Sequence, residues 1–421
     1  MNRQSVFFGK TALIATLVAL MFAAGLVQAR PLAKPEDTGG ARGDGTTDDT
    51  NSLQQVLDAG RTIILGSGKT YRITHRLDIV HNNTGIIGDG TATILMGSKA
   101  GEFDNQLPPK RYARNAVGVM IVGIANPRLV GVRVRFEGMV DDRIVKAIAV
   151  RGCSDIAIQF NDISGFSKAS GIIYIGSSKG GSVSYNHIHD SRTNSTTWGQ
   201  LTGILTDDDD VPGTSNIEIS HNYIHDLTVG ADFLSKFGYQ TDGINTTVRS
   251  TDLDISNNRI ENIGEGVDTF SLGGRIAQNE IVDAHNYGIK IIHGASHINI
   301  TDNTIKFSGK GGIVLAAGAT NSLDTQANII VGNSIIGVNI TREHDRTNTF
   351  GIGLVGSKAD TTAVRANIIE NNTIYLGGTA VFGIFAERGT GRDNIIKDNH
   401  IEGWTWAEYR LDPTSVPDQP E

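Results

Sequence analysis

The stretch 253–281 reads LDISNNRIENIGEGVDTFSLGGRIAQNEI, and it contains one short pattern twice. Asn258-Arg259-Ile260 and Asn279-Glu280-Ile281 are copies of the triplet Asn-x-Ile, set 21 residues apart. An isoleucine stands three residues before each asparagine, at Ile255 and Ile276. Alternating apolar positions of this kind are typical of strands that send every second side chain into a core. The stretch therefore predicts two consecutive turns of a repeating β structure.

The same triplet recurs across most of the chain. Its nine asparagines, each preceded at three residues by Ile or Val, are Asn161, Asn186, Asn222, Asn258, Asn279, Asn303, Asn333, Asn372 and Asn399. The intervals between them run from 21 to 39 residues, so a coil of fixed size carries loops of variable length. Short alternating runs broken by Gly and Asn indicate strands. We therefore expect an all-β fold, a single-stranded right-handed parallel β-helix solenoid with an asparagine ladder.

The composition agrees with such a solenoid and excludes several function classes. The 421 residues include 51 glycines and only 6% aromatic residues, which is typical of many tight turns. Cys153 is the single cysteine, so the chain forms no internal disulfide, and no Cys/His cluster has zinc spacing. The net charge of −8 offers no basic stripe for phosphates, so we expect no nucleic-acid partner. A local basic site can still bind acidic sugars.

The first 29 residues have the pattern of a signal peptide. Arg3 and Lys10 are basic, Thr11 to Leu26 is apolar, and Val27-Gln28-Ala29 is a small-x-small cleavage site. The apolar run is shorter than the ~20 residues that a membrane span needs. We therefore expect export to the periplasm or the extracellular space, with no membrane span after cleavage.

The next segment, 30–61, is expected to close one end of the solenoid. The acidic run from Gly43 to Thr50 precedes an amphipathic segment, Asn51 to Ala59. This order resembles the opening of the pectin-lyase-like β-helix proteins, in which a short helix covers the first coil. Leu53, Val56 and Leu57 have the spacing to cover the open core, with Thr50 or Asn51 as the helix cap. We expect the β-helix over 62–404, followed by a C-terminal tail over 405–421.

Loops are expected to leave the coils at three places, where the intervals between asparagines are long. These places are Arg192 to Trp198, Thr228 to Gln240 and Arg342 to Thr349.

A second pattern, Gly followed by an aliphatic residue, aligns the coils independently. Its copies are Gly171-Ile172, Gly203-Ile204, Gly243-Ile244, Gly266-Val267, Gly288-Ile289, Gly312-Ile313, Gly351-Ile352 and Gly383-Ile384. If the aliphatic residue points inward, the next residue points outward. These outward residues are Ile173, Leu205, Asn245, Asp268, Lys290, Val314, Gly353 and Phe385. The residues before the glycines are Ser170, Thr202, Asp242, Glu265, Tyr287, Gly311, Phe350 and Phe382.

Both columns become charged or polar in the same three coils. They bring together Asp242, Asn245, Glu265, Asp268, Tyr287 and Lys290, with His293 at the edge. We name Asp242, Glu265, Asp268 and Lys290 as candidate catalytic residues, and Asn245, Tyr287, His293, Arg275 and Trp198 as candidate substrate-binding residues. An ordinary solvated surface with a Lys290–Asp268 ion pair would give the same pattern.

The pattern predicts acid–base chemistry. Asp242 and Glu265 share a column, so their repulsion should raise one pKa, as a general acid requires. Asp268 lies between Asn245 and Lys290, which should favour its ionised form and suit a base or a nucleophile. We expect the carboxyls of Asp242 and Asp268 to reach the ~6.5–9.5 Å separation of inverting glycosidases.

Thr241-Asp242-Gly243 and Gly264-Glu265-Gly266 resemble the polygalacturonase family, whose Asn-Thr-Asp and Gly-Asp-Asp motifs lie one coil apart. The resemblance implies catalytic roles for Asp242 and Glu265 in glycoside hydrolysis. The family's third aspartate has no match, because Gly266 stands in its place, and the Gly-His-Gly motif is absent.

Two other functions fit the same residues. A polysaccharide lyase or C5-epimerase would use Arg275 or Lys290 to neutralise a uronate carboxylate, and Lys290, Tyr287 or His293 to remove the C5 proton. A protein that binds a glycan, or assists its export, would use the face only as a platform. All three readings make a polysaccharide or oligosaccharide the partner, and none predicts an oligomeric state.

We expect no cofactor and no metal ligand. The run Asp207-Asp208-Asp209-Asp210 is an alternative site for Ca²⁺, because this ion prefers oxygen ligands.

Overall fold

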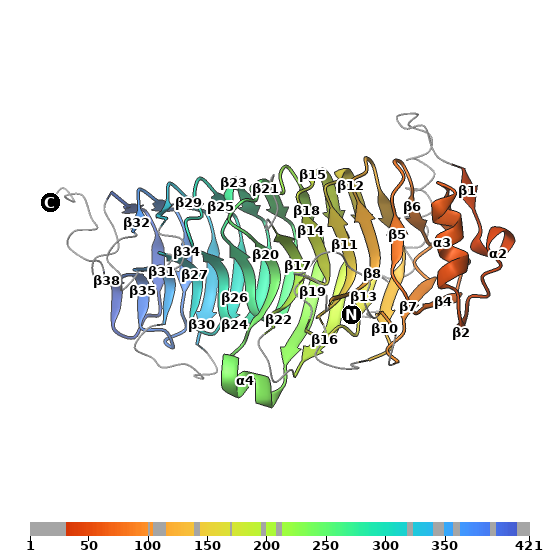
Figure 1. The fold of residues 1–421 in the computed structure, drawn as a ribbon. Helices are drawn as coiled ribbons and strands as arrows, with labels where there is room; N and C mark the ends of the chain where they lie inside the picture. Colours follow the sequence, from red (N-terminus) through yellow and green to blue (C-terminus); the bar gives the residue numbers. More distant parts are fainter. Residues whose placement is uncertain are drawn as a thin grey trace.

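The computed structural model describes residues 31–99, 102–103, 115–138, 144–168, 171–194, 199–207, 213–317, 323–339, 349–356, 363–387 and 393–410. These residues form one elongated stack of coils, with the N-terminal coils at one end and the C-terminal coils at the other (Figure 1). All pairings between named strands are parallel, and each strand pairs with the equivalent strands of the coils before and after it. The expected solenoid is confirmed. The expected signal peptide, 1–29, lies outside the described residues.

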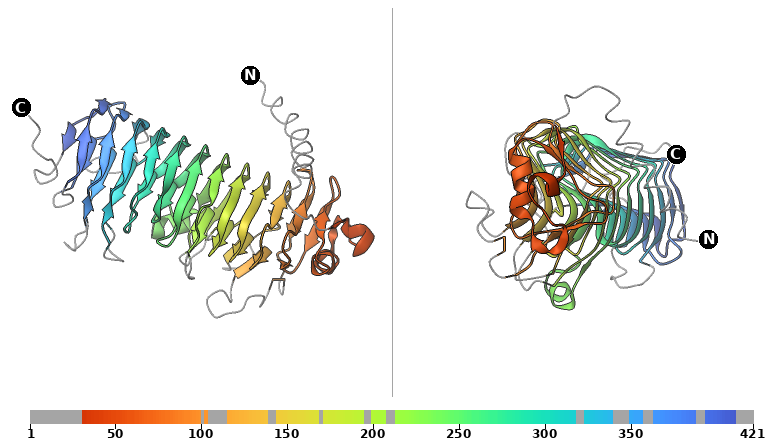
Figure 2. Two further views of the ribbon diagram at one scale, coloured as in Figure 1. Left: turned by 90° about the horizontal axis from the view of Figure 1, so that it is seen from above. Right: turned by 90° about the vertical axis from the view of Figure 1, so that its right-hand side faces the viewer.

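Each coil has three strands, and so the stack has three faces (Figure 2). The first face is a 13-stranded sheet of β1 (Leu32–Ala33), β3 (Thr62–Ile64), β6 (Gly85–Ile87), β9 (Arg128–Val130), β12 (Ser154–Gln159), β15 (Lys179–Ser184), β18 (Glu218–Ser220), β21 (Thr251–Ser256), β23 (Leu272–Ala277), β25 (Asn299–Thr301), β29 (Ile329–Val331), β33 (Ile368–Glu370) and β36 (Ile395–Lys397).

The second face, here called the asparagine face, consists mainly of the strands that follow the ladder asparagines. Its strands are β2 (Asp44–Asp48), β4 (Thr70–Ile73), β7 (Thr93–Met96), β10 (Arg133–Phe136), β13 (Asp162–Ser164), β16 (His187–Thr193), β19 (Tyr223–Val229), β26 (Thr304–Ser308), β30 (Ser334–Val338), β34 (Thr373–Tyr375) and β37 (His400–Glu402). The first parts of β22 (Arg259–Thr269) and β24 (Glu280–Ile291) belong to it as well.

The third face, here called the glycine face, contains the Gly-aliphatic pattern. Its strands are β5 (Leu77–Ile79), β8 (Asn115–Val122), β11 (Ile144–Arg151), β14 (Ile173–Gly176), β17 (Leu201–Asp207), β20 (Thr241–Thr246), β27 (Gly311–Ala316), β31 (Phe350–Val355), β35 (Phe382–Ala386) and β38 (Ala407–Arg410). β22 and β24 turn the corner and complete this face with their second parts. A separate pair, β28 (Thr325–Gln326) and β32 (Val364–Arg365), forms a two-stranded sheet.

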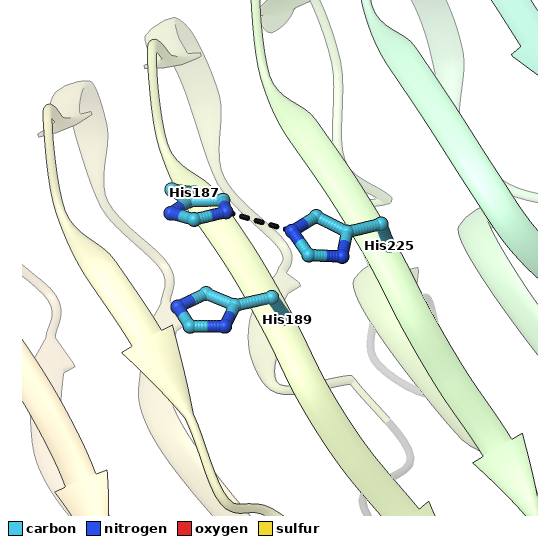
Figure 3. Close-up of side chains that lie close together, drawn as sticks. All are labelled: His187, His189 and His225. Atoms are coloured by element: carbon cyan, nitrogen blue, oxygen red, sulfur yellow. Dashed lines mark hydrogen bonds between the residues drawn. The ribbon is translucent and has the colours of Figure 1, made fainter. Parts of the chain in front are cut away.

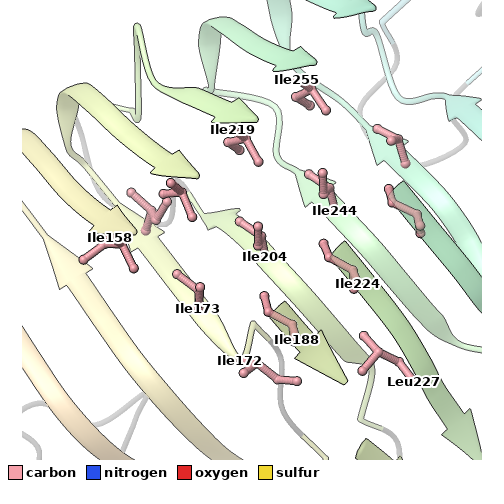
Figure 4. Close-up of a cluster of buried hydrophobic side chains, with 14 of the residues drawn as sticks. Ile158, Ile172, Ile173, Ile188, Ile204, Ile219, Ile224, Leu227, Ile244 and Ile255 are labelled. Carbon is pink, nitrogen blue, oxygen red and sulfur yellow. The ribbon is translucent and has the colours of Figure 1, made fainter. Parts of the chain in front are cut away.

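The core is a set of stacked aliphatic side chains inside the three faces. Ile158, Ile219 and Ile255, which precede three of the ladder asparagines, are at most 1% exposed. They stack from coil to coil and face isoleucines of the other two faces (Figure 4). Full burial of each such side chain stabilises the fold by about 1.5–3 kcal/mol.

The asparagine ladder is continuous from Asn161 to Asn399, as expected. In a typical step, Asn258 Nδ2 donates to Asn279 Oδ1 at 3.0 Å and to the Ile219 carbonyl at 2.8 Å. Asn258 Oδ1 in turn accepts from Asn222 Nδ2 at 2.9 Å and from the Asn222 amide at 3.0 Å. Each buried turn amide is satisfied in this way, which explains why Asn recurs at this corner.

A second, shorter ladder was not expected. Asn328 Nδ2 donates to Asn367 Oδ1, and Asn367 Nδ2 donates to Asn394 Oδ1, each at 3.0 Å. Each of these asparagines stands five residues before a ladder asparagine, a spacing visible in the sequence.

Glycine is required in its column because the neighbouring coil leaves no space for a side chain. A Cβ at Gly266 would lie 2.5 Å from the Gly288 carbonyl oxygen and 2.7 Å from Ile281 Cγ2. The isoleucine that follows a ladder asparagine therefore packs directly against this glycine. The Gly-aliphatic and Asn-x-Ile patterns thus meet in one packing contact, between the glycine of one coil and the isoleucine of the next.

The N-terminal end of the stack is covered by helix α3 (Thr50–Asp58), next to α2 (Pro35–Thr38) (Figure 2). Leu53, Val56 and Leu57 are at most 2% exposed, as their spacing predicts. The expected cap is wrong, because Asp49 is the N-cap residue and Thr50 begins the helix. The Thr50 hydroxyl instead accepts a buried hydrogen bond from the Thr74 amide at 2.9 Å.

The strands extend further than the sequence indicates. The β-helix was expected to span 62–404. Strand β1 precedes Thr62 and pairs with β3, and strand β38 follows Trp404 and pairs with β35. β16 and β19 each extend two residues into a predicted loop, and Arg192 and Thr193 pair in register with Thr228 and Val229. The second predicted loop then forms helix α4 (Ala231–Phe237).

The rest of the first predicted loop from 195 to 198, and the third from 342 to 348, lie outside the described residues. None of the described helices is long and apolar enough to cross a membrane.

Candidate active site

The two columns predicted on the glycine face are present in the strand register. In one column Asp242 lies beside Glu265 and Glu265 beside Tyr287. In the other, Asn245 lies beside Asp268 and Asp268 beside Lys290. The coil of Gly171, the first with the Gly-aliphatic pattern, is an exception. There Tyr174, and not the expected Ile173, pairs with Leu205. Gly171 has a φ of +77°, and Ile172 and Ile173 are both fully buried, so the alternation begins one residue later there.

The polar residues lie between two apolar clusters on the same face. Val117, Ala149, Tyr174 and Leu205 form one cluster in the preceding coils. Val314, Phe350, Val381, Phe382 and Phe385 form the other in the following coils. An acidic cluster between apolar groups experiences little solvent screening, so its charges interact strongly.

Lys290 is the centre of the acidic cluster. Its Nζ lies 2.9 Å from Glu265 Oε2 and 3.1 Å from Asp268 Oδ2. The side chains are only 22%, 10% and 4% exposed for Lys290, Glu265 and Asp268, respectively. Asp242 lies deeper, at 1% exposure. Its Oδ2 accepts hydrogen bonds from Asn245 Nδ2 at 3.0 Å and from Gln200 Nε2.

The carboxyl groups are strongly perturbed. Burial and the Glu265 carboxylate raise the pKa of Asp242 to about 7. The same two causes raise the pKa of Asp268 well above its usual range, although Lys290 opposes them. The expectation that Asp268 has a pKa favouring ionisation is therefore wrong. Its own burial and the Glu265 carboxylate raise the pKa more than the Lys290 ammonium lowers it. Burial disfavours the Lys290 ammonium, but the Asp268 and Glu265 carboxylates raise its pKa.

The carboxyls are closer together than expected. One oxygen each from Asp242, Glu265 and Asp268 lies within 4.8 Å of the others. This is shorter than the ~6.5–9.5 Å of inverting glycosidases and near the ~5–5.5 Å of retaining ones. The predicted gap for a water molecule between Asp242 and Asp268 is therefore wrong, because one oxygen of each carboxyl lies within 4.8 Å of the other.

The candidate substrate-binding residues separate into three groups. Tyr287 lies in the column beside Glu265, and its ring stacks on Phe350 with centroids 6.2 Å apart. His293 follows β24 and packs edge-on against Phe270. Arg275 is not at the site, because it lies in β23 on the 13-stranded sheet and forms an ion pair with Asp254 at 2.8 Å. Trp198 and the acidic residues Asp208, Asp209 and Asp210 lie outside the described residues, as does the side chain of Asp207.

The comparisons with known proteins agree with this architecture. A model of the right-handed β-helix region matches residues 139–305, which include the candidate catalytic residues. This chain is a right-handed parallel β-helix protein. No curated protein sequence matches it.

Three solved structures show how widely this β-helix fold recurs. The A-module of a mannuronan C-5 epimerase from Azotobacter vinelandii has a TM-score of 0.62 and 15% identity, covering 92% of this chain and 100% of the module. A surface adhesin of Streptococcus pneumoniae also has a TM-score of 0.62, with 13% identity over 90% of this chain and 91% of the adhesin. A family 28 exopolygalacturonase from Yersinia enterocolitica has a TM-score of 0.54 and 11% identity, covering 91% of this chain and 76% of the enzyme. At these identities, the likeness establishes the β-helix fold.

One residue of the site was missed in the sequence. Gln200 bonds to Asp242 from one coil earlier, two residues before Thr202, which pairs with Asp242. The Gly-aliphatic pattern considers only the positions beside the glycine, and Gln200 lies outside them.

Proposed function

We propose that this β-helix protein cleaves a polysaccharide by glycoside hydrolysis, with Asp242, Glu265, Asp268 and Lys290 as its catalytic residues. The observation that carries the proposal is the cluster of three carboxyls, two of them paired with one ammonium, on three adjacent strands between two apolar clusters of the same face. Buried carboxyls with raised pKa values are the groups that general acid catalysis requires near neutral pH.

The cluster supplies both functions of a glycosidase. Because the three carboxyls interact strongly, the proton that acts as the acid belongs to the cluster and not to one residue. Glu265 is the more exposed carboxyl of the pair held by Lys290, so we assign it the role of nucleophile or base. The short carboxyl separation favours attack on the sugar by the carboxylate, with retention of anomeric configuration.

The structural neighbours support the choice of substrate class. Two of the three named above are called a mannuronan C-5 epimerase and an exopolygalacturonase, and both names refer to polymers of sugar acids. We propose a uronate-containing polysaccharide, met outside the cytoplasm after export.

A panel of acidic and neutral polysaccharides tests the reaction. Hydrolysis produces new reducing ends without the ultraviolet absorbance of an unsaturated product, and proton NMR of the first product reports its anomeric configuration. Asp254→Asn is a matched control, since Asp254 also pairs with a cation, Arg275, but on the 13-stranded sheet. Loss of activity in Asp268→Asn with full activity in Asp254→Asn supports the site.

Lyase or epimerase chemistry is the second candidate, and the environment of His293 favours it. Burial and the Lys290 ammonium lower the pKa of His293, so its imidazole is neutral at pH 7 and able to accept a proton. Lys290 is a poor base here, because the carboxylates around it raise its pKa. An absorbing product identifies a lyase, and a changed uronate composition without chain cleavage identifies an epimerase. Binding without any product leaves the β-helix as a glycan-binding platform.

A further inference from the structure

Three histidines meet on the asparagine face, in the coil of Asn186 and in the coil of Asn222, which also contains Asp242. His187 and His189 are outward residues of β16, and His225 lies beside His189 on the neighbouring strand β19 (Figure 3). We propose that these three imidazoles bind one divalent transition-metal ion. The proposal is independent of the acidic cluster, which lies on another face of the stack.

The nitrogen atoms are spaced as ligands of one ion are. His187 Nε2 and His225 Nε2 are 2.8 Å apart, and one nitrogen from each of the three rings lies within 4.8 Å of the others. Ligands at the ~2.0–2.1 Å bond length of zinc are roughly 3.3 Å apart around a tetrahedral ion. The His187 and His189 rings are stacked with centroids 4.0 Å apart, so they must rotate before nitrogens of both rings can bind one ion.

Two of the rings are oriented by carboxylates, as metal-binding histidines usually are. His189 Nδ1 lies 2.7 Å from Asp190 Oδ2, and His225 Nδ1 lies 2.7 Å from Asp226 Oδ2. When each Nδ1–H donates to its aspartate, Nε2 keeps the lone pair that binds a metal; His225 Nε2 faces His187, and His189 Nε2 faces Asp162. Asp226 is itself held by a hydrogen bond from Asn262 Nδ2 at 2.5 Å.

Asp162 is positioned to complete the coordination. It lies one coil earlier, and its Oδ1 is 3.0 Å from His189 Nε2 while its Oδ2 is 3.8 Å from His187 Nδ1. An oxygen and a nitrogen at 3.0 Å can be neighbouring ligands of one ion. The ion would then connect the three successive coils that contain β13, β16 and β19.

The charge around the histidines suits a divalent cation. Asp162, Asp190 and Asp226 contact the rings, and Arg135 is the cation paired with Asp162. Three carboxylates and one guanidinium leave two negative charges beside the three imidazoles. In the acidic cluster of the glycine face, by contrast, the Lys290 ammonium already lies between the carboxylates.

The ligand type selects the class of metal. Imidazole nitrogens prefer zinc, copper, nickel, cobalt or iron over calcium and magnesium, which take oxygen ligands. The side chains of His187, His189 and His225 are 32%, 14% and 16% exposed, so an ion and a water ligand can reach them.

The sequence search for zinc spacing missed this site because the ligands come from two coils. The signal is the repeated pair His-Asp at the same offset from a ladder asparagine: Asn186-His187-Ile188-His189-Asp190 and Asn222-Tyr223-Ile224-His225-Asp226. Stacking two coils in register turns this repeat into a cluster.

Titration of the purified full chain with Zn²⁺, after removal of bound metal by a chelator, tests the proposal. Calorimetry should show one strong site per chain, and Co²⁺ should give the visible absorption of a tetrahedral nitrogen-ligated ion. His225→Ala and His189→Ala should abolish this site, whereas Asp226→Asn should weaken binding ~10–100-fold through the orientation of His225. His400→Ala is the matched control, because His400 also pairs with a carboxylate, Glu402, at 2.9 Å on the same face.

The Asp226→Asn variant keeps the proposal testable if the histidine variants fail to fold, which circular dichroism would reveal. Absence of a Zn²⁺ site in the wild-type chain would overturn the proposal. Equal Zn²⁺ affinity in wild type, His225→Ala and Asp226→Asn would do the same. Asp268→Asn should bind Zn²⁺ like wild type.

Discussion

The Lys290 ammonium lies 2.9 Å from the Glu265 carboxylate of the adjacent strand, and it also touches Asp268 at 3.1 Å. A single cation thus holds two carboxyls, with the third, Asp242, buried behind them. Removing this cation should affect stability as well as activity, because the carboxyls would lose the charge that compensates their repulsion.

Lys290→Met should lower the free energy of unfolding by about 3–5 kcal/mol at pH 8, the range for breaking a buried ion pair. The loss should be smaller at pH 5, where Asp242, with its pKa raised to about 7, binds a proton and no longer repels the other carboxyls. Denaturant titration at both pH values measures the difference. Lys306→Met is the control, since the more exposed Lys306–Glu280 pair should contribute less than about 1 kcal/mol. Equal losses in both variants would contradict the central role of Lys290.

Asp268→Asn keeps the shape of the side chain but removes its ability to ionise. Activity should fall by at least ~10²-fold, while the free energy of unfolding stays within ~1 kcal/mol of wild type. Initial rates of reducing-end release and a thermal melt provide the two readouts. Unchanged turnover would mean that Asp268 is only an ion-pair partner.

Asp242→Asn and His293→Gln distinguish the reaction classes. Loss of activity at Asp242, with His293 dispensable, indicates hydrolysis, and the reverse pattern indicates lyase or epimerase chemistry with His293 as the base. Full activity in both variants and in Asp268→Asn would exclude this face as the active site.

The raised pKa of Asp242 predicts a pH dependence of stability. The folded protein holds the Asp242 proton up to about pH 7, whereas the unfolded chain releases it near the ordinary value of about 3.9. Between these values the folded state binds more protons, so this group makes the free energy of unfolding fall as pH rises. Asp242→Asn should therefore flatten the curve in this window and gain stability relative to wild type at pH 8. Parallel curves for the two proteins would show that Asp242 does not titrate in this range.

The asparagine ladder predicts a difference between the middle and the end of the stack. Asn258→Ala removes four hydrogen bonds at a site that is 1% exposed, and it should lower the free energy of unfolding by about 3–5 kcal/mol, since each unsatisfied buried group costs about 1–3 kcal/mol. Asn399→Ala, at the last rung, should cost less, because one of its bonds is exposed to water. Urea unfolding of both variants gives the comparison, and equal losses would rule out a cooperative buried ladder.

The fold was predictable because two sequence patterns, Asn-x-Ile and Gly-aliphatic, repeat with the same coil. The asparagines fix one corner and the glycines another, and the structure joins them where Ile281 packs on Gly266. The predicted alignment was wrong where the backbone conformation departs from the repeat. The outward column contains Tyr174 and not the predicted Ile173, because Gly171 adopts a positive φ. The spacing of residues in the sequence does not reveal this backbone conformation.

The sequence predicted which residues of the candidate site are neighbours, but it did not predict the directions of their side chains or the distances between them. Strand register placed Asp242, Asp268 and Lys290 together, since register depends only on the coil repeat. Side-chain direction decided the rest: Arg275 belongs to another face, and the three carboxyls lie close together instead of leaving space for water. The perturbed pKa of Asp268 follows from burial, which the sequence does not show.

The ladder has a consequence for how such a chain evolves. Each inner ladder asparagine makes the same hydrogen bonds to the coil before it and to the coil after it, so this environment repeats along the stack. Duplicating or deleting one whole coil recreates that environment at the new junction, while a change of a few residues in a strand destroys it. Chain length in this lineage should therefore change in whole coils, and smaller insertions should accumulate in the loops between Asn186 and Asn222 or between Asn333 and Asn372. The three coils that contain Asp242, Asp268 and Lys290 must stay adjacent, which makes them the segment where no coil can be inserted without loss of the site.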